Sequence, residues 1–447
     1  MLGVLLLIIA IGLYFLPRHR YLSYLLYISF MLGYGGGLGL LTDQVIGIKN
    51  MDIAIIYTFV ISLYLLVKQK YYIPKAGFKK WYVAFGVFMF FDVCFSYFYY
   101  DFTLYQILQG GRAFLLIFSF PILYQIRKDE ITKIFRILCY IITITSVLYI
   151  LQVVTGRLIL PYAGEPSIDP STGLIRVYNK PPLIGFFLAL TFISPEYFGR
   201  RVNMHRIIYL GAVFCGLGRT SIFCTLLTVL LAMLFMGKAT KIVKTCLILG
   251  ILILPFMDML TARYENSDTS GDIESIFSGG YASYQAGEGG NMAYRLAWIY
   301  ERTEYLSTRP IGEKIFGLGL ISDSQPLVNK MYNFVLGLPD PQTDLPTQLS
   351  TPDISYGNMI TKLGYVGTFI YLAFVIAMAV FLFRNRKAGN MATVCAAELV
   401  FVFLLSMAGT ALSEPKLFAV YFICIASVMK GYGDLTNSTK GDCKTIG

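Results

Sequence analysis

Long runs of apolar residues, separated by short polar connections, make up most of the chain. Thirteen of these runs are long enough, or nearly so, to cross a bilayer as a helix, which takes about 20 residues. They lie near 1–16, 22–41, 50–67, 81–99, 111–126, 136–155, 181–195, 206–218, 220–237, 242–261, 362–383, 391–411 and 415–430. The pattern predicts an all-α polytopic membrane protein with about 13 transmembrane helices.

The amino-acid composition agrees with this class. Hydrophobic residues make up 56% of the chain and charged residues 14%, whereas soluble domains carry about 25% charged residues. These values exclude a soluble Rossmann or TIM-barrel enzyme, a disulfide scaffold and a disordered chain. The first apolar run lacks a basic n-region and a small-residue cleavage site, so we expect a span there rather than a signal peptide.

The distribution of positive charge predicts how the chain is oriented in the membrane. The formal net charge is +11, and 23 of the 37 Lys and Arg residues lie in or at the edges of every second connection between the apolar runs, or in the C-terminal tail. By the positive-inside rule these connections face the cytoplasm, so the N-terminus is expected outside and the C-terminus inside. Because the charge sorts by membrane side, we expect membrane lipid as a partner and no nucleic acid.

The apolar runs divide the chain into four segments. They are N-terminal spans at 1–261, a large outer loop at 262–361, C-terminal spans at 362–433 and a cytoplasmic tail at 434–447. A loop of this length inside a compact protein is usually functional. Its first part, 266–291, is rich in Gly, Ser and acidic residues, and both a flexible linker and a substrate lid fit that composition.

The second part of the loop predicts an amphipathic helix over 292–307. Apolar and aromatic residues recur there at helical spacing, and Arg295, Trp298 and Arg302 fall on one face. Pro310 is expected to stop the helix. One interpretation is a helix lying at the membrane interface, anchored by Trp298 and the tyrosines. The other is a face that presents its arginines to an anionic ligand.

Several basic residues lie on the expected outer side, against the general bias. Arg219 follows Gly216-Leu217-Gly218 between two apolar runs. An ionisable group at that depth usually faces a cavity or a partner, although snorkelling to the interface is the alternative. Arginine suits phosphate because its planar fork donates two hydrogen bonds at once. The other candidates for an anionic site are Arg112, Arg176, Lys180, Arg295 and Arg302.

Asp353 stands at the end of the outer loop, just before a span. A carboxylate there is a candidate general base, but Asp is also a common helix N-cap, and position alone favours the cap. Both histidines, His19 and His205, fall in expected cytoplasmic connections, so Asp353 has no histidine competitor on the outer side. The sequence contains no CxxC motif or Cys/His cluster, and we expect neither a metal nor a cofactor.

Four short motifs follow one another in an order that resembles a known family. They are Arg176-Val177-Tyr178-Asn179-Lys180-Pro181 with Gly185; Gly218-Arg219-Thr220-Ser221; Arg295 with Trp298, Pro310, Gly317 and Gly319; and Asp353 with Tyr356, Leu363, Gly364 and Gly367. With its many spans and one large outer loop before the last few, the chain resembles the bacterial O-antigen polymerase and O-antigen ligase superfamily.

The resemblance implies a fold, a reaction and a location. The fold is the C-type glycosyltransferase (GT-C) arrangement, with the large loop in the periplasm and the spans in the inner membrane. The implied enzyme is a metal-independent glycosyltransferase, an O-antigen polymerase. It transfers the growing glycan from undecaprenyl diphosphate to the non-reducing end of a lipid-linked repeat unit. A chain-length regulator protein is an expected partner.

The residues that match the motifs take roles in this hypothesis. Arg219 and Arg295 are the leading diphosphate ligands and Asp353 is the candidate base, while Tyr356 is expected to position the acceptor. The secondary diphosphate ligands are Arg112, Arg176, Lys180 and Arg302.

Two alternatives remain open. In ligases of this superfamily a histidine stands at the position of Asp353, so the aspartate favours the polymerase branch. The chain also departs from the motif at Ile354, where the family has Asn, and at Lys362, where it has an acid. A flippase or other transporter of lipid-linked oligosaccharide also needs cations for the diphosphate, but it would place them in a deep central cavity and needs no hundred-residue outer loop.

Overall fold

The computed structural model describes most of the chain. The described residues are 2–32, 44–45, 48–161, 166–168, 173–177, 180–237, 239–253, 291–339 and 345–432. For a few residues within these ranges, Arg219 among them, only the backbone is described. The expected linker or lid at 266–291, apart from Asn291, and the expected tail at 434–447 lie outside the described residues.

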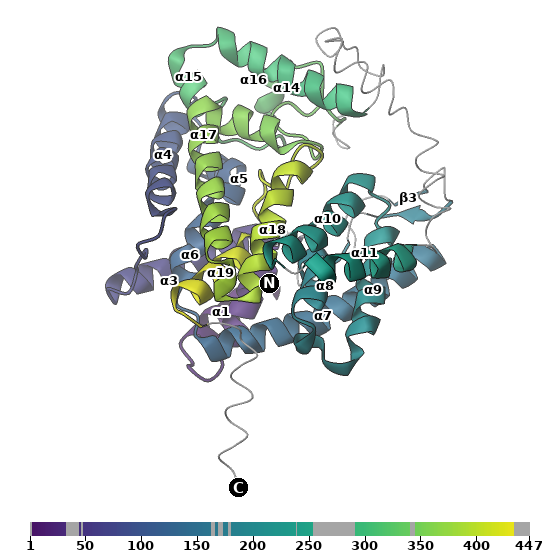
Figure 1. Cartoon of the computed structure of the whole chain (residues 1–447). Helices are drawn as coiled ribbons and strands as arrows, with labels where there is room; N and C mark the ends of the chain where they lie inside the picture. Colours follow the sequence, from purple (N-terminus) through teal and green to yellow (C-terminus); the bar gives the residue numbers. More distant parts are fainter. Residues whose placement is uncertain are drawn as a thin grey trace.

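The described chain is built almost entirely of helices (Figure 1). Before the expected outer loop they are α1 (Leu2–Tyr14), α2 (Arg20–Met31), α3 (Asn50–Val67), α4 (Lys79–Phe98), α5 (Leu104–Leu115), the 3-10 helix η1 (Leu116–Ser119), α6 (Phe120–Leu123), α7 (Lys128–Thr155), α8 (Ile184–Ile193), the 3-10 helix η2 (Pro195–Arg201), α9 (Val202–Cys215), α10 (Arg219–Phe235) and α11 (Ala239–Ile253). In the loop and after it they are α14 (Asn291–Thr308), α15 (Ile311–Phe316), α16 (Val328–Met331), α17 (Ser355–Arg384), the 3-10 helix η5 (Arg386–Ala388), α18 (Asn390–Leu405) and α19 (Phe418–Met429).

The described strands form two short antiparallel hairpins. β1 (Gln44–Val45) pairs with β2 (Ile48–Lys49), and β3 (Ser167–Ile168) pairs with β4 (Ile175–Arg176). With strand content this low, the predicted all-α class is confirmed.

Membrane-spanning character is visible in the length and composition of the helices. Among the described residues, five helical segments are long and apolar enough to cross a membrane: Asn50–Val67, Lys79–Phe98, Leu104–Leu123, Lys128–Thr155 and Ser355–Arg384. Shorter apolar helices cover other expected spans, and each of the thirteen expected segments contains a helix. The structure therefore agrees with a multi-pass membrane protein, while the number of crossings stays a prediction.

Two local features explain where particular helices begin and end. α5 starts after Thr103, whose side chain accepts a hydrogen bond from the backbone N–H of Gln106, while the Gln106 side chain accepts one from the N–H of Thr103. α14 ends at Thr308, and Pro310 follows as the N-cap residue of α15. The expected helix at 292–307 and its stop before Pro310 are both confirmed.

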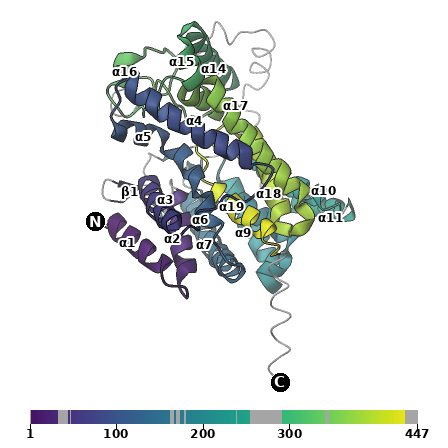
Figure 2. The same ribbon diagram turned by 90° about the vertical axis from the view of Figure 1, so that its left-hand side faces the viewer.

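Helices α18 and α19 lie at the centre of the molecule. α19 is buried from Phe418 to Ser427, and α18 is buried along most of its length. α10 and α8 pack along one side of α18, and α17 packs along another. Figures 1 and 2 show α14, α15 and α16 gathered at the end of the molecule where α17 begins.

α17 is bent at Gly364, where the helix touches the backbone of the outer loop. Gly364 has φ +62° and ψ −171°, which interrupts the helix between a first part over 355–363 and a second part over 365–384. A Cβ on Gly364 would lie 2.6 Å from the backbone nitrogen of Gly317, so the two backbones touch directly. Beside them, the N–H of Leu318 donates to the carbonyl of Thr361 at 2.7 Å. We call this contact the glycine junction.

Candidate functional site

The start of α17 and the helix α14 are packed so closely that they form one unit. Gly357 makes this possible, because a Cβ there would lie 2.3 Å from Cζ3 of Trp298. Trp298 is fully buried in a small cluster with Ala297, Leu336 and Ile354. Its burial argues against the interpretation in which it is an interface anchor. The packing also sets Arg295, one turn before Trp298, beside Asp353, the neighbour of Ile354.

Arg295 and Asp353 lie close together but leave part of each other's hydrogen-bonding capacity unused. An outer guanidinium nitrogen of Arg295 lies 3.9 Å from Oδ1 of Asp353, which is within ion-pair range but too long for a hydrogen bond. The Arg295 side chain is 18% exposed and that of Asp353 is 35% exposed. Nε of Arg295 is buried and has no hydrogen-bond partner among the described residues. Both groups therefore keep capacity for a ligand.

The helix-cap interpretation of Asp353 is wrong. α17 begins at Ser355, and its N-cap residue is Ile354, which makes no side-chain cap hydrogen bond. Asp353 lies one residue too early to cap the helix. The preceding turn is closed by Asn358 instead, whose Oδ1 accepts from the N–H of Thr351 at 2.8 Å and whose Nδ2 donates to the Thr351 carbonyl at 2.7 Å. The carboxylate is therefore not consumed by the helix it precedes.

Tyr356 and Ser355 attach this end of α17 to the end of α18 and to the connection after it. The Tyr356 hydroxyl donates to the carbonyl of Phe403 at 2.8 Å. The Ser355 hydroxyl donates to the carbonyl of Gly409 at 2.7 Å, and the Ser355 N–H donates to the carbonyl of Ser406 at 2.9 Å. Tyr356 thus has a structural hydrogen bond where the sequence suggested contact with an acceptor.

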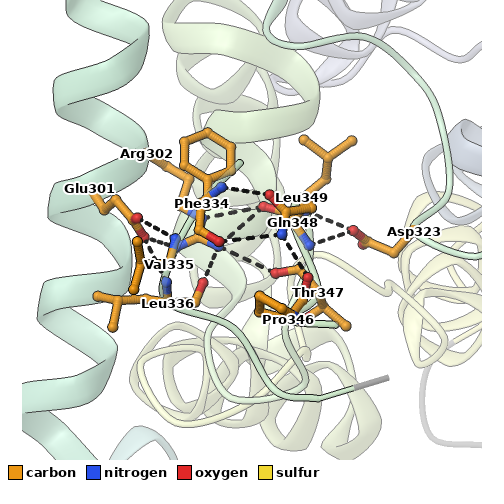
Figure 3. Close-up of polar contacts among 10 residues, drawn as sticks. All are labelled: Glu301, Arg302, Asp323, Phe334, Val335, Leu336, Pro346, Thr347, Gln348 and Leu349. Atoms are coloured by element: carbon orange, nitrogen blue, oxygen red, sulfur yellow. Dashed lines mark hydrogen bonds and ion pairs between the residues drawn. The ribbon is translucent and has the colours of Figure 1, made fainter. Parts of the chain in front are cut away.

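Arg302 occupies a closed environment, unlike Arg295 on the same helix. Its side chain is fully buried, and its guanidinium donates to the carbonyls of Leu336, Thr347 and Gln348 (Figure 3). Glu301 completes the set as an ion-pair partner. Burial lowers the pKa of Arg302 to about 10, so the group stays charged at neutral pH. The geometry favours a structural role, in which Arg302 holds the ends of the segment 334–349 together.

The side chain of Gln348 extends the same network. Its Oε1 accepts from the N–H of Phe334 at 2.7 Å, and its Nε2 donates to the carbonyl of Pro346 at 2.7 Å. The carboxylate of Asp323 accepts from the N–H groups of Gln348 and Leu349 at 2.9 and 2.8 Å (Figure 3). The described part of the loop is therefore a folded structure around Arg302.

Lys180 lies at the turn between α9 and α10. Its Nζ donates to Oγ of Ser221 at 2.6 Å, and Ser221 is two residues after Arg219, the first residue of α10. The turn is tight, because Leu217 takes a positive φ of 52°. The structure thus brings Lys180 to the turn that carries Arg219, whose side chain lies outside the described residues.

Arg176 and Arg112 take two other positions. Arg176 is half-buried in β4, opposite Ser167 of β3, and the next carbonyl, of Val177, accepts a hydrogen bond from Tyr149 of α7 at 2.9 Å. Arg112, near the end of α5, forms an ion pair with Asp52 at 3.5 Å. The expected cations are therefore spread over several elements. Among the described groups, Lys180 makes no direct contact with Arg295 or Asp353.

Three charged groups that interact with Arg112, directly or through Glu414, were not among the candidates from sequence. They are Lys362 in the first part of α17, and Glu414 and Lys416 in the connection 406–417. The signal that could have found them is the same one that found Arg112: each lies within a few residues of the outer end of an expected span. Among the described residues, no group of three His, Cys, Asp or Glu side chains is placed to hold a metal ion.

Comparison with models of protein families and with curated proteins finds no match for this chain.

Proposed function

We propose that this chain is a glycan polymerase of the bacterial inner membrane. It would move a growing glycan from undecaprenyl diphosphate to the non-reducing end of a lipid-linked repeat unit, at the periplasmic face. The proposal includes the expected crossings, about 13, the GT-C arrangement, an N-terminus outside and a C-terminus in the cytoplasm. A chain-length regulator protein is the proposed protein partner.

The observation that carries the proposal is the pairing of Arg295 with Asp353. A transfer from a lipid diphosphate needs a cation for the leaving group and a base for the acceptor. Here one of each lies at 3.9 Å, partly exposed, at the expected outer end of a span. A pair made only for stability would be expected to form short, aligned hydrogen bonds, as Arg309 does with Glu313 at 2.8 and 3.0 Å.

The proposed step balances without any further reactant. The acceptor hydroxyl oxygen attacks the anomeric carbon of the donor glycan, and the bond from that carbon to the diphosphate oxygen breaks. The bonding electron pair stays on the diphosphate, where Arg295 stabilises the charge that develops. The acceptor proton passes to the carboxylate of Asp353. Arginine serves here because it donates two hydrogen bonds and does not lose its proton.

The remaining candidates divide by their surroundings. Lys180 and the turn that carries Arg219 stay in the proposed diphosphate site, and Arg176 stays a secondary ligand. Arg302 leaves the set, because its donors are occupied by backbone carbonyls. Tyr356 becomes a residue that positions Asp353 by holding α17 to α18.

A gel of surface lipopolysaccharide tests the proposal. A strain lacking this gene would be complemented with the wild-type chain or with Arg295→Ala. We expect the deletion strain and the variant to show core carrying one repeat unit, and the wild-type chain to restore long glycans. Core with one unit means that flipping and ligation still occur while polymerisation has stopped.

Two other patterns would contradict the proposal and point to the alternatives. Bare core, with long lipid-linked glycans accumulating, would identify a ligase. Bare core with single units confined to the cytoplasmic leaflet would identify a flippase. Wild-type glycan lengths in Arg295→Ala would remove Arg295 from the mechanism.

A further inference from the structure

Three cations from three different elements act electrostatically on one carboxylate, that of Glu414, at the expected outer side. Arg112 comes from α5, Lys362 from α17 and Lys416 from the connection 406–417. Nζ of Lys416 lies 2.7 Å from Oε2 of Glu414. Burial alone would raise the pKa of the Glu414 carboxyl, but Lys416, Lys362 and Arg112 together hold that pKa below its usual value. We call these four residues the cation cluster.

The outer-loop segment at the glycine junction contacts both the helix that carries Arg112 and the helix that carries Lys362. A Cβ on Gly110 would lie 2.4 Å from the backbone nitrogen of Ile321, so α5 touches the segment that follows Gly319. The same segment is bonded to α17 through Leu318 and Thr361, the residue before Lys362. The backbone near Arg112 and the backbone near Lys362 therefore contact the same stretch of chain.

The connection 406–417 is also fixed to α17. The Tyr371 hydroxyl donates to the carbonyl of Leu412 at 2.7 Å, and the N–H of Leu412 donates to Oγ of Ser355 at 3.2 Å. Glu414 and Lys416 follow two and four residues later. The backbone segments that carry the cluster are thus held to one another by these contacts.

The positive charge of the cluster is only partly neutralised by the protein. Lys362 makes no hydrogen bond or ion pair with any described residue. Asp323, the other carboxylate that acts on Lys362, already accepts hydrogen bonds from the N–H groups of Gln348 and Leu349 and from the Ser350 hydroxyl. Asp52 faces Arg112 at 3.5 Å and is 40% exposed. An ammonium group without a partner at the end of a span marks a ligand site.

We propose that the cation cluster binds a second lipid diphosphate, that of the acceptor, apart from the Arg295–Asp353 pair. This inference rests on the proposed function, because a polymerase holds two lipid diphosphates at once. One diphosphate leaves during the step and the other must stay attached to the product. A diphosphate offers several anionic oxygens, which suits three cations that approach from three elements. Glu414 holds Lys416 in place while the site is empty.

Native mass spectrometry of the full chain in detergent counts bound ligands directly. The probe is sugar-free undecaprenyl diphosphate, and the proteins are wild type, Lys362→Met, Arg112→Gln, Arg295→Ala and the double variant Lys362→Met/Arg295→Ala. We expect up to two bound lipids on the wild type and one on each single variant. The double variant should bind the probe at least tenfold more weakly at either position.

Three further probes test whether the site recognises the diphosphate group itself or any anionic lipid. They are inorganic diphosphate, undecaprenyl monophosphate and phosphatidylglycerol. Displacement of one lipid by inorganic diphosphate would support recognition of the diphosphate itself. Equal occupancy of the Lys362-dependent position by phosphatidylglycerol would overturn the proposal, because the cluster would then bind any anionic lipid.

The outcomes distinguish the failure of this inference from the failure of the proposed function. A single bound lipid that is lost in Arg295→Ala and kept in Lys362→Met would overturn the inference and leave the proposed function standing. The opposite pattern is also possible: the wild type binds two lipids, Lys362→Met and Arg112→Gln each lose one of them, and Arg295→Ala keeps both. That result would support the cluster and count against Arg295.

Lys330→Met is the matched control. Lys330 is exposed on α16 in the outer loop, and its change to Met matches that of Lys362. It should keep both lipids. Lys362→Arg, which preserves the charge, should retain the second lipid if the cluster acts through its cations. Loss of the lipid in Lys362→Arg, in a chain that melts at the wild-type temperature, would count against it.

Discussion

The guanidinium of Arg302 stacks on the indole ring of Trp298, with its central carbon 4.0 Å from the ring centroid. The ring of Phe334 lies on the same group at 4.5 Å. A cation between two aromatic rings, with its N–H groups on backbone carbonyls, is favourable only because every part of it is satisfied. Two arginines of one helix, Arg295 and Arg302, therefore have different surroundings, one partly exposed and one enclosed.

Arg302→Met should therefore reduce stability. The substitution leaves buried carbonyls without donors, at about 1–3 kcal/mol for each one. We expect a lower melting temperature in detergent and less protein in the membrane. Arg157→Met, at an exposed position, is the matched control. A normal melting temperature with lost polymerisation would instead return Arg302 to the ligand set.

Asp353→Asn should abolish activity without affecting the fold. The amide keeps the size of the carboxylate but cannot accept the acceptor proton, and loss of a general base costs roughly 10²–10⁴-fold in rate. The measurement is glycan length produced from purified lipid-linked repeat units. Asp129→Asn, at an exposed position on the expected cytoplasmic side, should behave as wild type. A rate within a factor of about three of wild type would exclude Asp353 as the base.

Gly364→Ala should disrupt the glycine junction. At φ +62° an L-residue is strained, and the added Cβ would lie 2.5 Å from the carbonyl oxygen of Ile315. Strain of this kind costs about 1–3 kcal/mol before the clash is counted. Gly12→Ala, which meets nothing within 4 Å in α1, is the control. Equal melting temperatures for the two variants would show that the junction tolerates a side chain.

Glu414 predicts a pH dependence of stability. Lys416, Lys362 and Arg112 outweigh burial and lower the pKa of this carboxyl below its ordinary value of 4.5. The carboxylate therefore stabilises the fold above about pH 4.5, and that contribution is lost as the pH falls through the lower, folded-state pKa. Glu414→Gln should flatten the decrease in melting temperature between pH 5 and pH 3. An unchanged slope would mean that other acids produce it.

The helices could be predicted from sequence because their signal is local. The apolar runs located a helix in every expected span, and the spacing around Trp298 with the stop at Pro310 located α14. The bend in α17 could not be predicted, because Gly364 takes its conformation from Gly317, more than forty residues away. Helical spacing finds a face but says nothing of what lies against it.

The same limit applies to the candidate site. Arg295 and Arg302 share a helix face, and only the contacts of Arg302 with backbone carbonyls of the outer loop show that it is enclosed. For Asp353 the sequence left both a base and a helix cap open, and position alone favoured the cap because aspartate often has that role, whereas the helix is capped one residue later, at Ile354. Lys362 was visible only as a departure from a motif, and its neighbours Arg112 and Glu414 come from distant parts of the chain.

The bend in α17 places Asp353 at the far end of the first part of that helix. Nine residues, 355–363, separate Asp353 and Ile354 from the bend at Gly364. At about 1.5 Å of rise per residue this first part of the helix is roughly 13 Å long. A rotation of about 5° at Gly364 would then move the Asp353 carboxylate by about 1 Å, a misplacement that can reduce a rate by roughly 10². In the proposed mechanism, the position of the reacting carboxylate thus depends on angular stiffness at Gly364, far from the reacting atoms.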